Sequence, residues 1–367
     1  MALRISRAGR VTGTIIAVTA VAALGAAASL RSARADQFDH DDGGHDRDHR
    51  KFTVALWGDM PYGALGKQQY PALLQDVNSA HVAFSVFDGD LKAGGDGPCT
   101  DDNLYTPAVA AFASLERPLI WVPGDNDWTD CWGRYGPGTF APGADDPEER
   151  LQHERDLFAS TPFSLGQRKL RLTRQSSAGG AYAIYSENVR WKYGPVVFIG
   201  LNVQGSNDNF PYAGVDGETR SDAEIARQRA EEVARKAADI AWLNESFGYA
   251  KTVGALGVMI VFQADLNFNN EQHLTDTRSW DAFPDYVNAL RDASLAFSGQ
   301  VVLVHGDSHY YKVDQPISTS AGGVVANFTR LETYGSRNNH WVAVTIDASN
   351  PRVFSFEPRI VAANVDP

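Results

Sequence analysis

Three acidic residues follow three short apolar segments at matching positions in the first third of the sequence. Asp59, Asp90 and Asp125 each come directly after a glycine, and each Gly-Asp pair ends a run typical of a buried strand. The carboxyl ends of parallel strands meet at one edge of a sheet, so these carboxylates are expected to lie close together. Like charges at such separations are costly unless protons or a cation neutralise them. The pattern predicts a metal site; the alternative is that each Gly-Asp is an ordinary solvated turn.

Alternating strands and helices are expected to position these acids. The runs 52–57, 82–87 and 119–122 are apolar and rich in strand-forming residues, whereas 67–80 and 106–115 have helical spacing. This order is typical of a parallel sheet with crossover helices.

Two later strand ends also carry potential ligands. Gln263 and Asp265 follow the apolar run 258–262, and the run 301–304 leads into His305-Gly-Asp-Ser-His309. The remaining expected elements are helices at 146–160, 221–247 and 281–296, a strand pair at 181–185 and 191–201, and strands at 324–327, 341–346 and 353–356.

The first 35 residues have the pattern of a signal peptide. Three arginines precede an uncharged stretch at 11–30, and Ala33-Arg34-Ala35 supplies a small-x-small cleavage site. A membrane anchor is the alternative, but the stretch is mostly Ala, Thr and Gly with little Leu or Ile. We therefore expect an exported protein, secreted or periplasmic, with no membrane association after signal removal.

Residues 36–51 are expected to form a disordered acidic and His-rich linker before a domain at 52–360. The linker has no apolar periodicity. Its histidines at 40, 45 and 49 are interpreted as part of a solvated tail, with weak metal binding as the alternative.

The chain has two cysteines, Cys99 and Cys131. An even number in an exported protein predicts one disulfide, and two free thiols are the alternative. The bridge would join the loops that contain Asp90 and Asp125.

A formal net charge of -12 argues against nucleic-acid backbone or an anionic membrane as a partner. An anionic substrate would need a local reversal of this field, and a metal ion is the usual means.

The order of these motifs resembles that of the calcineurin-like metallophosphoesterases. The matching residues are Gly58-Asp59, Gly89-Asp90-x-Lys92, Gly124-Asp-Asn-Asp127 and Gly306-x-x-His309. Lys92 and the Trp-Thr-Asp-Cys at 128–131 match a divergent branch of that family. The resemblance implies an α/β fold, a four-layer α/β/β/α sandwich with a metal site at the sheet edge.

The resemblance also implies a set of metal ligands. Asp59, Asp90 and His309 carry over unchanged, whereas Asp125 stands for an Asn, and Gln263 and Asp307 stand for histidines. The first motif departs as well, because Pro61 occupies the place of a ligating His. Oxygen donors favour Mg²⁺, Mn²⁺ or Ca²⁺ over Zn²⁺, and one or two ions are expected.

The activity implied by the resemblance is phosphoester hydrolysis, in which a metal-bound hydroxide attacks phosphorus. Asn126 replaces the family's catalytic His; it can donate a hydrogen bond but cannot supply a proton near neutral pH. His305 is the candidate acid, on the reasoning that an extended segment puts 305, 307 and 309 on one side; a buried core histidine is the alternative. Asp127 is expected to orient the catalytic groups, and Lys92 to bind a phosphate oxygen unless it pairs with an Asp.

The sequence as a whole predicts an exported, metal-dependent hydrolase of a small phosphorylated substrate. The alternative is a catalytically silent extracellular module in which the metal only braces the loops.

Overall fold

The fold is known from a computed structural model that describes residues 49–131, 146–210, 222–268 and 281–365. Contacts between residues separate Met1–Phe38 from Asp39–Pro367, and the fold is that of the second unit. The expected signal peptide, and the expected linker up to residue 48, lie outside the described residues. Within the described ranges, every helix is too short or too polar to cross a membrane.

The first sheet holds the strands that end in Gly-Asp. Its order is β12-β11-β1-β2-β3, in which β1, β2 and β3 are parallel neighbours and β11 runs antiparallel to β1 and β12. The expected parallel arrangement of the three strands is therefore confirmed. The bounds are β1 (Lys51–Trp57), β2 (Ser85–Phe87), β3 (Leu119–Trp121), β11 (Trp341–Asp347) and β12 (Phe354–Arg359).

The second sheet has the order β4-β5-β6-β7-β8-β10-β9. Its centre, from β6 through β7 and β8 to β10, is parallel, while β4, β5 and β9 pair antiparallel. The bounds are β4 (Thr173–Arg174), β5 (Val189–Tyr193), β6 (Val196–Gly200), β7 (Gly257–Val261), β8 (Gln300–His305), β9 (Lys312–Asp314) and β10 (Phe328–Glu332).

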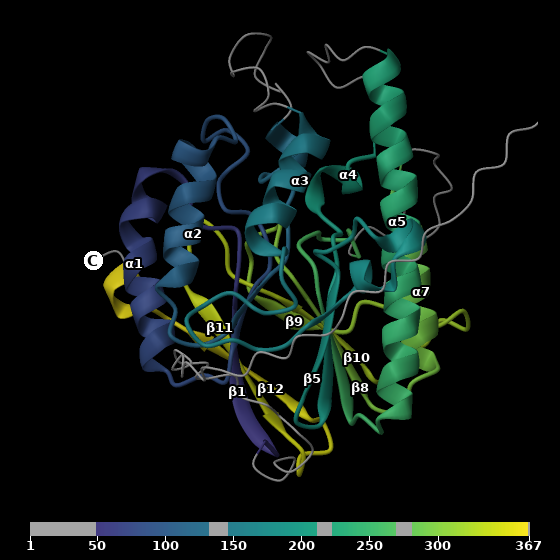
Figure 1. Ribbon diagram of the computed structural model, residues 1–367. Helices are drawn as coiled ribbons and strands as arrows, with labels where there is room; N and C mark the ends of the chain where they lie inside the picture. The colour runs from purple at the N-terminus through teal and green to yellow at the C-terminus, as the bar shows by residue number, and fades with distance from the viewer. Residues whose placement is uncertain (1–48, 132–145, 211–221, 269–280, 366–367) are drawn as a thin grey trace, which may run out of the picture. The chain divides into compact units, whose positions relative to one another are not determined.

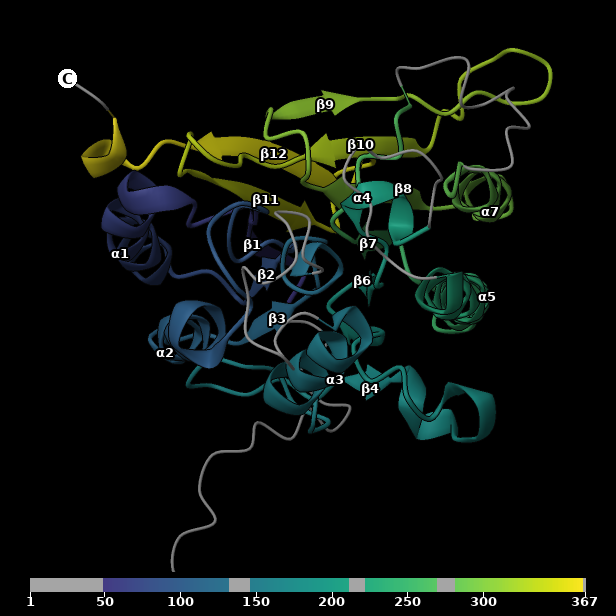
Figure 2. The ribbon, with the colours of Figure 1, turned by 90° about the horizontal axis from the view of Figure 1, so that it is seen from above.

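Helices cover the outer face of each sheet (Figures 1 and 2). α1 (Gly63–Ser79) and α2 (Thr106–Ala113) lie on the first sheet, and α5 (Asp222–Thr252) and α7 (Pro284–Leu295) lie on the second. α3 (Pro147–Phe158) packs beside β3, and α4 (Gly205–Asp208) is a short turn after β6. The expected four-layer α/β/β/α sandwich is confirmed.

Alternation along β1 explains the layers. Val54 and Leu56 belong to the core shared with the second sheet, whereas Ala55 and Trp57 belong to the core beneath α1 and α2. Successive strand residues point to opposite faces, so a fully apolar strand must be covered on both sides.

Two expected strands differ in the structure. The strand pair expected at 181–185 and 191–201 is in fact β5 and β6, joined by a turn at Gly194 (φ 52) and Pro195, while Gly180–Tyr182 forms a short helical turn. The strand expected at 324–327 begins four residues later, at Phe328.

Candidate metal centre

The strand ends of both sheets meet where the expected ligands lie. Asp59, Asp90 and Asp125 follow β1, β2 and β3, and Gln263 and Asp307 follow β7 and β8. The two sheet edges are in contact, because the backbone N–H of Asp307 donates to Asp59 Oδ2 at 3.0 Å and Gln263 Nε2 donates to Asp59 Oδ1 at 3.5 Å. Residues more than two hundred positions apart in the sequence thus share one cluster.

Several expected ligands have an unusual backbone conformation. Asp59, Asp90, Asp307 and His309 have φ values of 50°, 66°, 72° and 68°. Such values are uncommon outside glycine, and they cluster at sites where the surroundings impose them. Here the turns redirect each side chain from its strand toward the shared cluster.

The glycines of the Gly-Asp pairs leave room for acids of neighbouring segments. A Cβ at Gly124 would lie 2.0 Å from Asp90 Oδ1, and one at Gly306 would lie 1.9 Å from Asp59 Oδ2. Both separations are far inside van der Waals contact. The repeated Gly-Asp pattern therefore reflects close packing between the loops.

Burial and mutual repulsion alter the acidity of the cluster. Burial, and then the charge of Asp130, raises the pKa of Asp125 from 3.8 to about 7. Burial, followed by the charges of Asp125 and Asp59, raises the pKa of both Asp90 and Asp307 well above the usual range. The carboxylates thus carry more negative charge than their surroundings neutralise.

This donor set fits a hard divalent cation. In the described parts of the chain, no group of three or more His, Cys, Asp or Glu side chains is already arranged to hold a metal ion. The cluster is nevertheless rich in carboxylate oxygen, and Asp125 Oδ1 is buried without a hydrogen-bond partner. Oxygen ligands of this kind suit Mg²⁺, Mn²⁺ or Ca²⁺.

Tyr62 and Asn126 form a polar group beside Asp90. The Tyr62 hydroxyl donates to Asp90 Oδ2 at 2.7 Å. The Asn126 side-chain amide donates to the same oxygen at 2.5 Å and to the Tyr62 hydroxyl at 3.1 Å. Burial, and then Asp90 and Asp59, raises the pKa of Tyr62 well above 10, so the phenol keeps its proton.

Asp127 holds the loop that carries Asp90. Its carboxylate accepts hydrogen bonds from the backbone N–H groups of Asp90 at 3.0 Å, Leu91 at 2.6 Å and Gly124 at 3.3 Å. The structure therefore places Asp127 behind the cluster, where it fixes the second and third loops together.

His309 faces the cluster through one ring nitrogen. Its Nδ1 lies 2.7 Å from the Ser336 carbonyl oxygen, and its Nε2 lies 3.4 Å from Asp59 Oδ1. Burial acts to lower the pKa of His309, but the hydrogen bond and charge of Asp59 raise it above 6.5. A carbonyl on Nδ1 is the usual support of an imidazole that ligates through Nε2.

His305 and Lys92, expected to act on the substrate, are both buried. His305 is buried, with Nδ1 at 2.9 Å from the Gly306 carbonyl, and burial lowers its pKa to about 4. The turns at Asp307 and His309 break the extended geometry that would have put 305, 307 and 309 on one side. Lys92 is buried as well, and its ammonium donates to the Ala93 carbonyl at 3.3 Å. Burial lowers its pKa, and the charges of Asp127 and Asp90 oppose that shift.

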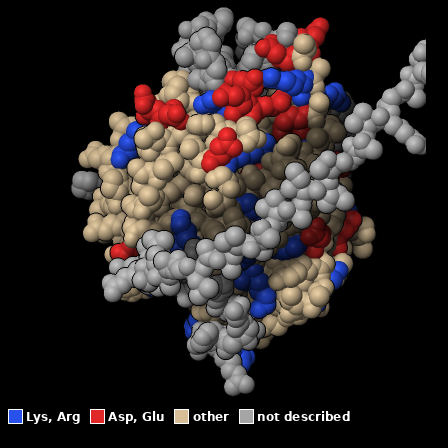
Figure 3. Space-filling view, in the orientation of Figure 1, with Lys and Arg blue, Asp and Glu red and all other residues tan. Residues whose placement is uncertain are grey.

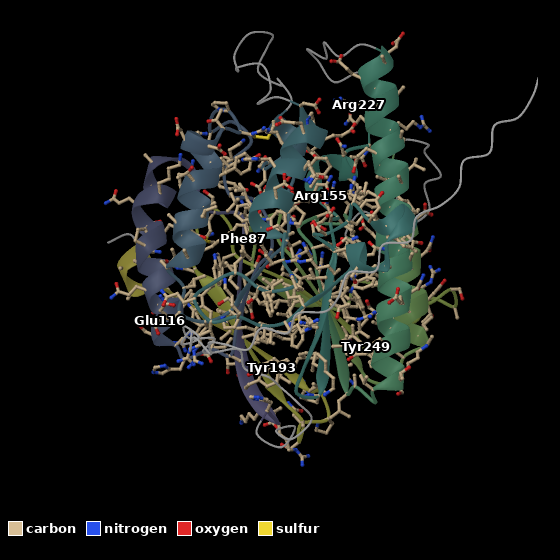
Figure 4. All side chains as sticks on the ribbon, viewed as in Figure 1. Phe87, Glu116, Arg155, Tyr193, Arg227 and Tyr249 are labelled. Atoms are coloured by element: carbon tan, nitrogen blue, oxygen red, sulfur yellow. A yellow bond between two sulfur atoms is a disulfide. The ribbon has the colours of Figure 1, made fainter. Side chains whose placement is uncertain are left out.

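The disulfide between Cys99 and Cys131 is confirmed (Figure 4, yellow bond), with a Cα–Cα distance of 5.6 Å. It joins the second and third loops. Cys131 follows directly on Asp130, and the backbone N–H of Asp130 donates to the Asp125 carbonyl at 2.8 Å.

Sequence reasoning missed four residues of the cluster: Tyr62, Asp88, Asp130 and Ser206. Asp88 is buried beside Asp59, and Ser206 bonds to both Asp125 and Asp130. Asp88 and Asp130 lie within the motifs and were open to inference. Ser206 follows a strand with no such motif, so only the fold reveals it.

No protein-family model and no curated protein sequence matches this chain. Among solved structures, it is similar to a dimetal phosphatase from Danio rerio, with 13% identity, a TM-score of 0.46, and coverage of 85% of this chain and 96% of that one.

Two further similarities have comparable scores. One is to GAP50, described as the anchor in the inner membrane complex of Plasmodium, with 12% identity, a TM-score of 0.43, and coverage of 84% and 89% of the two chains. The other is to a 5'-nucleotidase from Candida albicans, with 11% identity, a TM-score of 0.43, and coverage of 83% of this chain but 50% of that one.

Scores of this size transfer no activity to the chain. The order of its motifs, its four layers and the meeting of its acidic strand ends are properties of the chain itself. The resemblance to the calcineurin-like metallophosphoesterases is carried by the order of the sequence motifs.

Proposed function

We propose that this chain is a divalent-cation-dependent hydrolase of phosphoesters. The observation that carries the proposal is the cluster of carboxylates from four strand ends, in which Asp59, Asp90 and Asp125 are buried and Asp307 is partly buried. Within it, Asp125 Oδ1 is left without a hydrogen-bond partner. These four residues, with Gln263 and His309, would hold one or two ions of Mg²⁺, Mn²⁺ or Ca²⁺. A bound cation would screen phosphoryl oxygens and make a water molecule more acidic.

The chain's own side chains would orient the expected ligands. Tyr62 and Asn126 would orient the Asp90 carboxylate, because the Tyr62 O–H and an Asn126 N–H both donate to its Oδ2. Asp127 would keep the two loops in register through its backbone contacts. The Lys92 ammonium would offset part of the negative charge of Asp127 and Asp90.

A small cavity beside the cluster supports a small phosphorylated substrate. It has a volume of about 320 Å³ and is lined by Tyr62, Ser336, Arg337, Asn339 and the first turn of α1. Acidic side chains gather on the visible face where α3 and α5 begin (Figure 3). They would repel an anionic substrate, so a positively charged side chain at the cavity would help to retain it. Arg337 is exposed at this cavity, and within the described ranges it has no hydrogen bond or ion pair.

Calorimetric titration of residues 36–367 with Mn²⁺, Mg²⁺ and Ca²⁺, followed by assays on phosphomonoesters and phosphodiesters, tests this proposal. We expect stoichiometric binding, cation-dependent turnover, and loss of both in Asp90→Asn. The control Asp156→Asn changes an exposed acid on α3 and should behave as wild type. Absence of cation binding by the wild type would refute the proposal.

A silent module braced by a metal is the second candidate. Asn126 lies beside Asp90, in the place where an acid would have to protonate the leaving group, and an amide cannot supply that proton. His305 is buried and neutral, so it does not replace that acid. Cation binding with no turnover, together with a melting temperature that falls in chelator, would favour this alternative.

Export is also part of the proposal. The disulfide supports an oxidising compartment. Amino-terminal sequencing of protein recovered from the medium or periplasm should begin at Asp36, and a retained residue 1–35 segment would contradict it.

A further inference from the structure

A turn of left-handed backbone follows β6. Ser206, Asn207, Asp208 and Asn209 have consecutive φ values of 47°, 56°, 56° and 60°. Residues with a side chain visit this region singly, and a run of them is disfavoured by contacts between Cβ and the backbone. Such a run persists only where the surroundings impose it.

A buried ion pair holds this 205–209 turn. Arg235 on α5 is fully buried and donates from Nη1 to Asp208 Oδ1 at 2.6 Å and from Nη2 to the Asp208 carbonyl at 2.7 Å. The Tyr286 hydroxyl on α7 donates to Asp208 Oδ2 at 3.1 Å. The turn is thus fastened to the helices that cover the second sheet.

The other end of the turn touches the candidate metal centre. The Ser206 hydroxyl lies 2.7 Å from Asp125 Oδ2 and 2.8 Å from Asp130 Oδ1. The Gly205 N–H donates to Gln263 Oε1 at 2.5 Å. A Cβ at Gly205 would come within 2.8 Å of Asp307 Oδ1, so the turn is wedged among side chains from three strand ends.

We propose that the 205–209 turn forms one side of the cation site, and that the Ser206 hydroxyl orients the Asp125 and Asp130 carboxylates. A hydroxyl has one proton, so it donates to one carboxylate while the other lies against the same oxygen. Ser206 thereby holds two acids at one point and turns the unpartnered Asp125 Oδ1 toward the cluster. This inference rests on the proposed cation-dependent function.

The test is Mn²⁺ calorimetry on three variants of the mature chain. Ser206→Gly and Ser206→Ala both remove the hydroxyl, and glycine also relieves the left-handed backbone. His81→Gly is the matched control, because it also relieves a left-handed residue (φ 52) but changes an exposed side chain outside the 205–209 turn.

We expect both Ser206 variants to bind Mn²⁺ about tenfold more weakly, as is typical when a partner of a ligand is lost. Ser206→Gly should keep or raise the melting temperature, and His81→Gly should bind as wild type. Wild-type affinity in both Ser206 variants would overturn the role of Ser206 and leave the proposed function standing. No binding by the wild type would overturn both.

Discussion

The acid–base properties of Tyr62 follow from its surroundings rather than from its residue type. Burial and two carboxylates keep its phenol protonated, and the hydroxyl donates to Asp90 at 2.7 Å. We expect Tyr62→Phe to weaken Mn²⁺ binding about tenfold, because a buried carboxylate then loses a hydrogen bond that orients it. Isothermal titration measures the effect.

Tyr70→Phe is the control for this change. Tyr70 is buried, and its hydroxyl contacts Trp57 Nε1 at 3.3 Å in the core beneath α1, away from the carboxylates. The variant should bind Mn²⁺ as wild type does. Equal loss in the two variants would show that Tyr62 acts only through general packing.

The sequence predicted correctly the location of residues that come just after a strand. Asp59, Asp90 and Asp125 come directly after apolar runs, and parallel pairing brings such ends together. His305 was not open to the same inference. Its expected side of the segment assumed extended backbone, whereas Asp307 and His309 have φ values of 72° and 68°.

The turns that follow the strands pack so closely that some positions require glycine. Gly306 lies so close to Asp59 that a methyl group would displace the carboxylate. We expect Gly306→Ala to weaken Mn²⁺ binding by at least tenfold and to destabilise the fold by roughly 1–3 kcal/mol, the usual cost of overpacking. Urea unfolding and calorimetry measure the two effects.

Gly323→Ala is the matched glycine control. The nearest atom to its added Cβ would be Thr319 Oγ1 at 3.6 Å, an ordinary contact. It should change neither stability nor cation binding. If Gly306→Ala also left both unchanged, the close approach of Gly306 to Asp59 would be wrong.

The disulfide stabilises the same loops. It closes a segment of 32 residues in sequence separation, for which chain entropy predicts a contribution of about 3–4 kcal/mol. We expect Cys99→Ser with Cys131→Ser to lower the free energy of unfolding by roughly this amount. Thermal unfolding of the double variant against the wild type, both without reductant, gives the value; an unchanged melting temperature would contradict it.

Element boundaries were harder to infer where side chains hold loops rather than strands. The apolar run at 324–327 resembled a strand, but Asn327 donates to the carbonyls of Ser294, Phe297 and Gly299 and ties the segment to the end of α7. Val325 is buried there without belonging to a strand. Apolar periodicity alone does not distinguish these cases.

For the whole molecule, the two-sheet architecture followed from the motif order rather than from any single element. Strands β4 and β9, with bounds of Thr173–Arg174 and Lys312–Asp314, are too short to give a period. The fold also places the charges. Arg235, Asp208 and Asp239 are all fully buried and form one network of charged side chains at the 205–209 turn. Nothing in their sequence spacing indicates that they lie together.

The stability of the metal-free molecule should fall as pH rises. Burial raises the pKa of Asp125 and Asp127 from 3.8 to about 7, so the folded state binds these protons more tightly than the unfolded state. Their contribution is complete below pH 4 and is lost as pH rises toward 7. His305 opposes this trend below pH 6.5, because burial lowers its pKa to about 4.

A cation reverses the trend, because it binds the deprotonated carboxylates. We expect the melting temperature in chelator to fall by several degrees between pH 5 and pH 8, at about 2–4 °C for each kcal/mol. Excess Mn²⁺ should remove most of that fall, so the gap between the two curves should widen with pH. Differential scanning calorimetry of wild type and Asp125→Asn measures it, since Asn has no proton to lose and should flatten the chelator curve. A gap that stayed constant from pH 5 to pH 8 would mean that the cation does not bind through these acids.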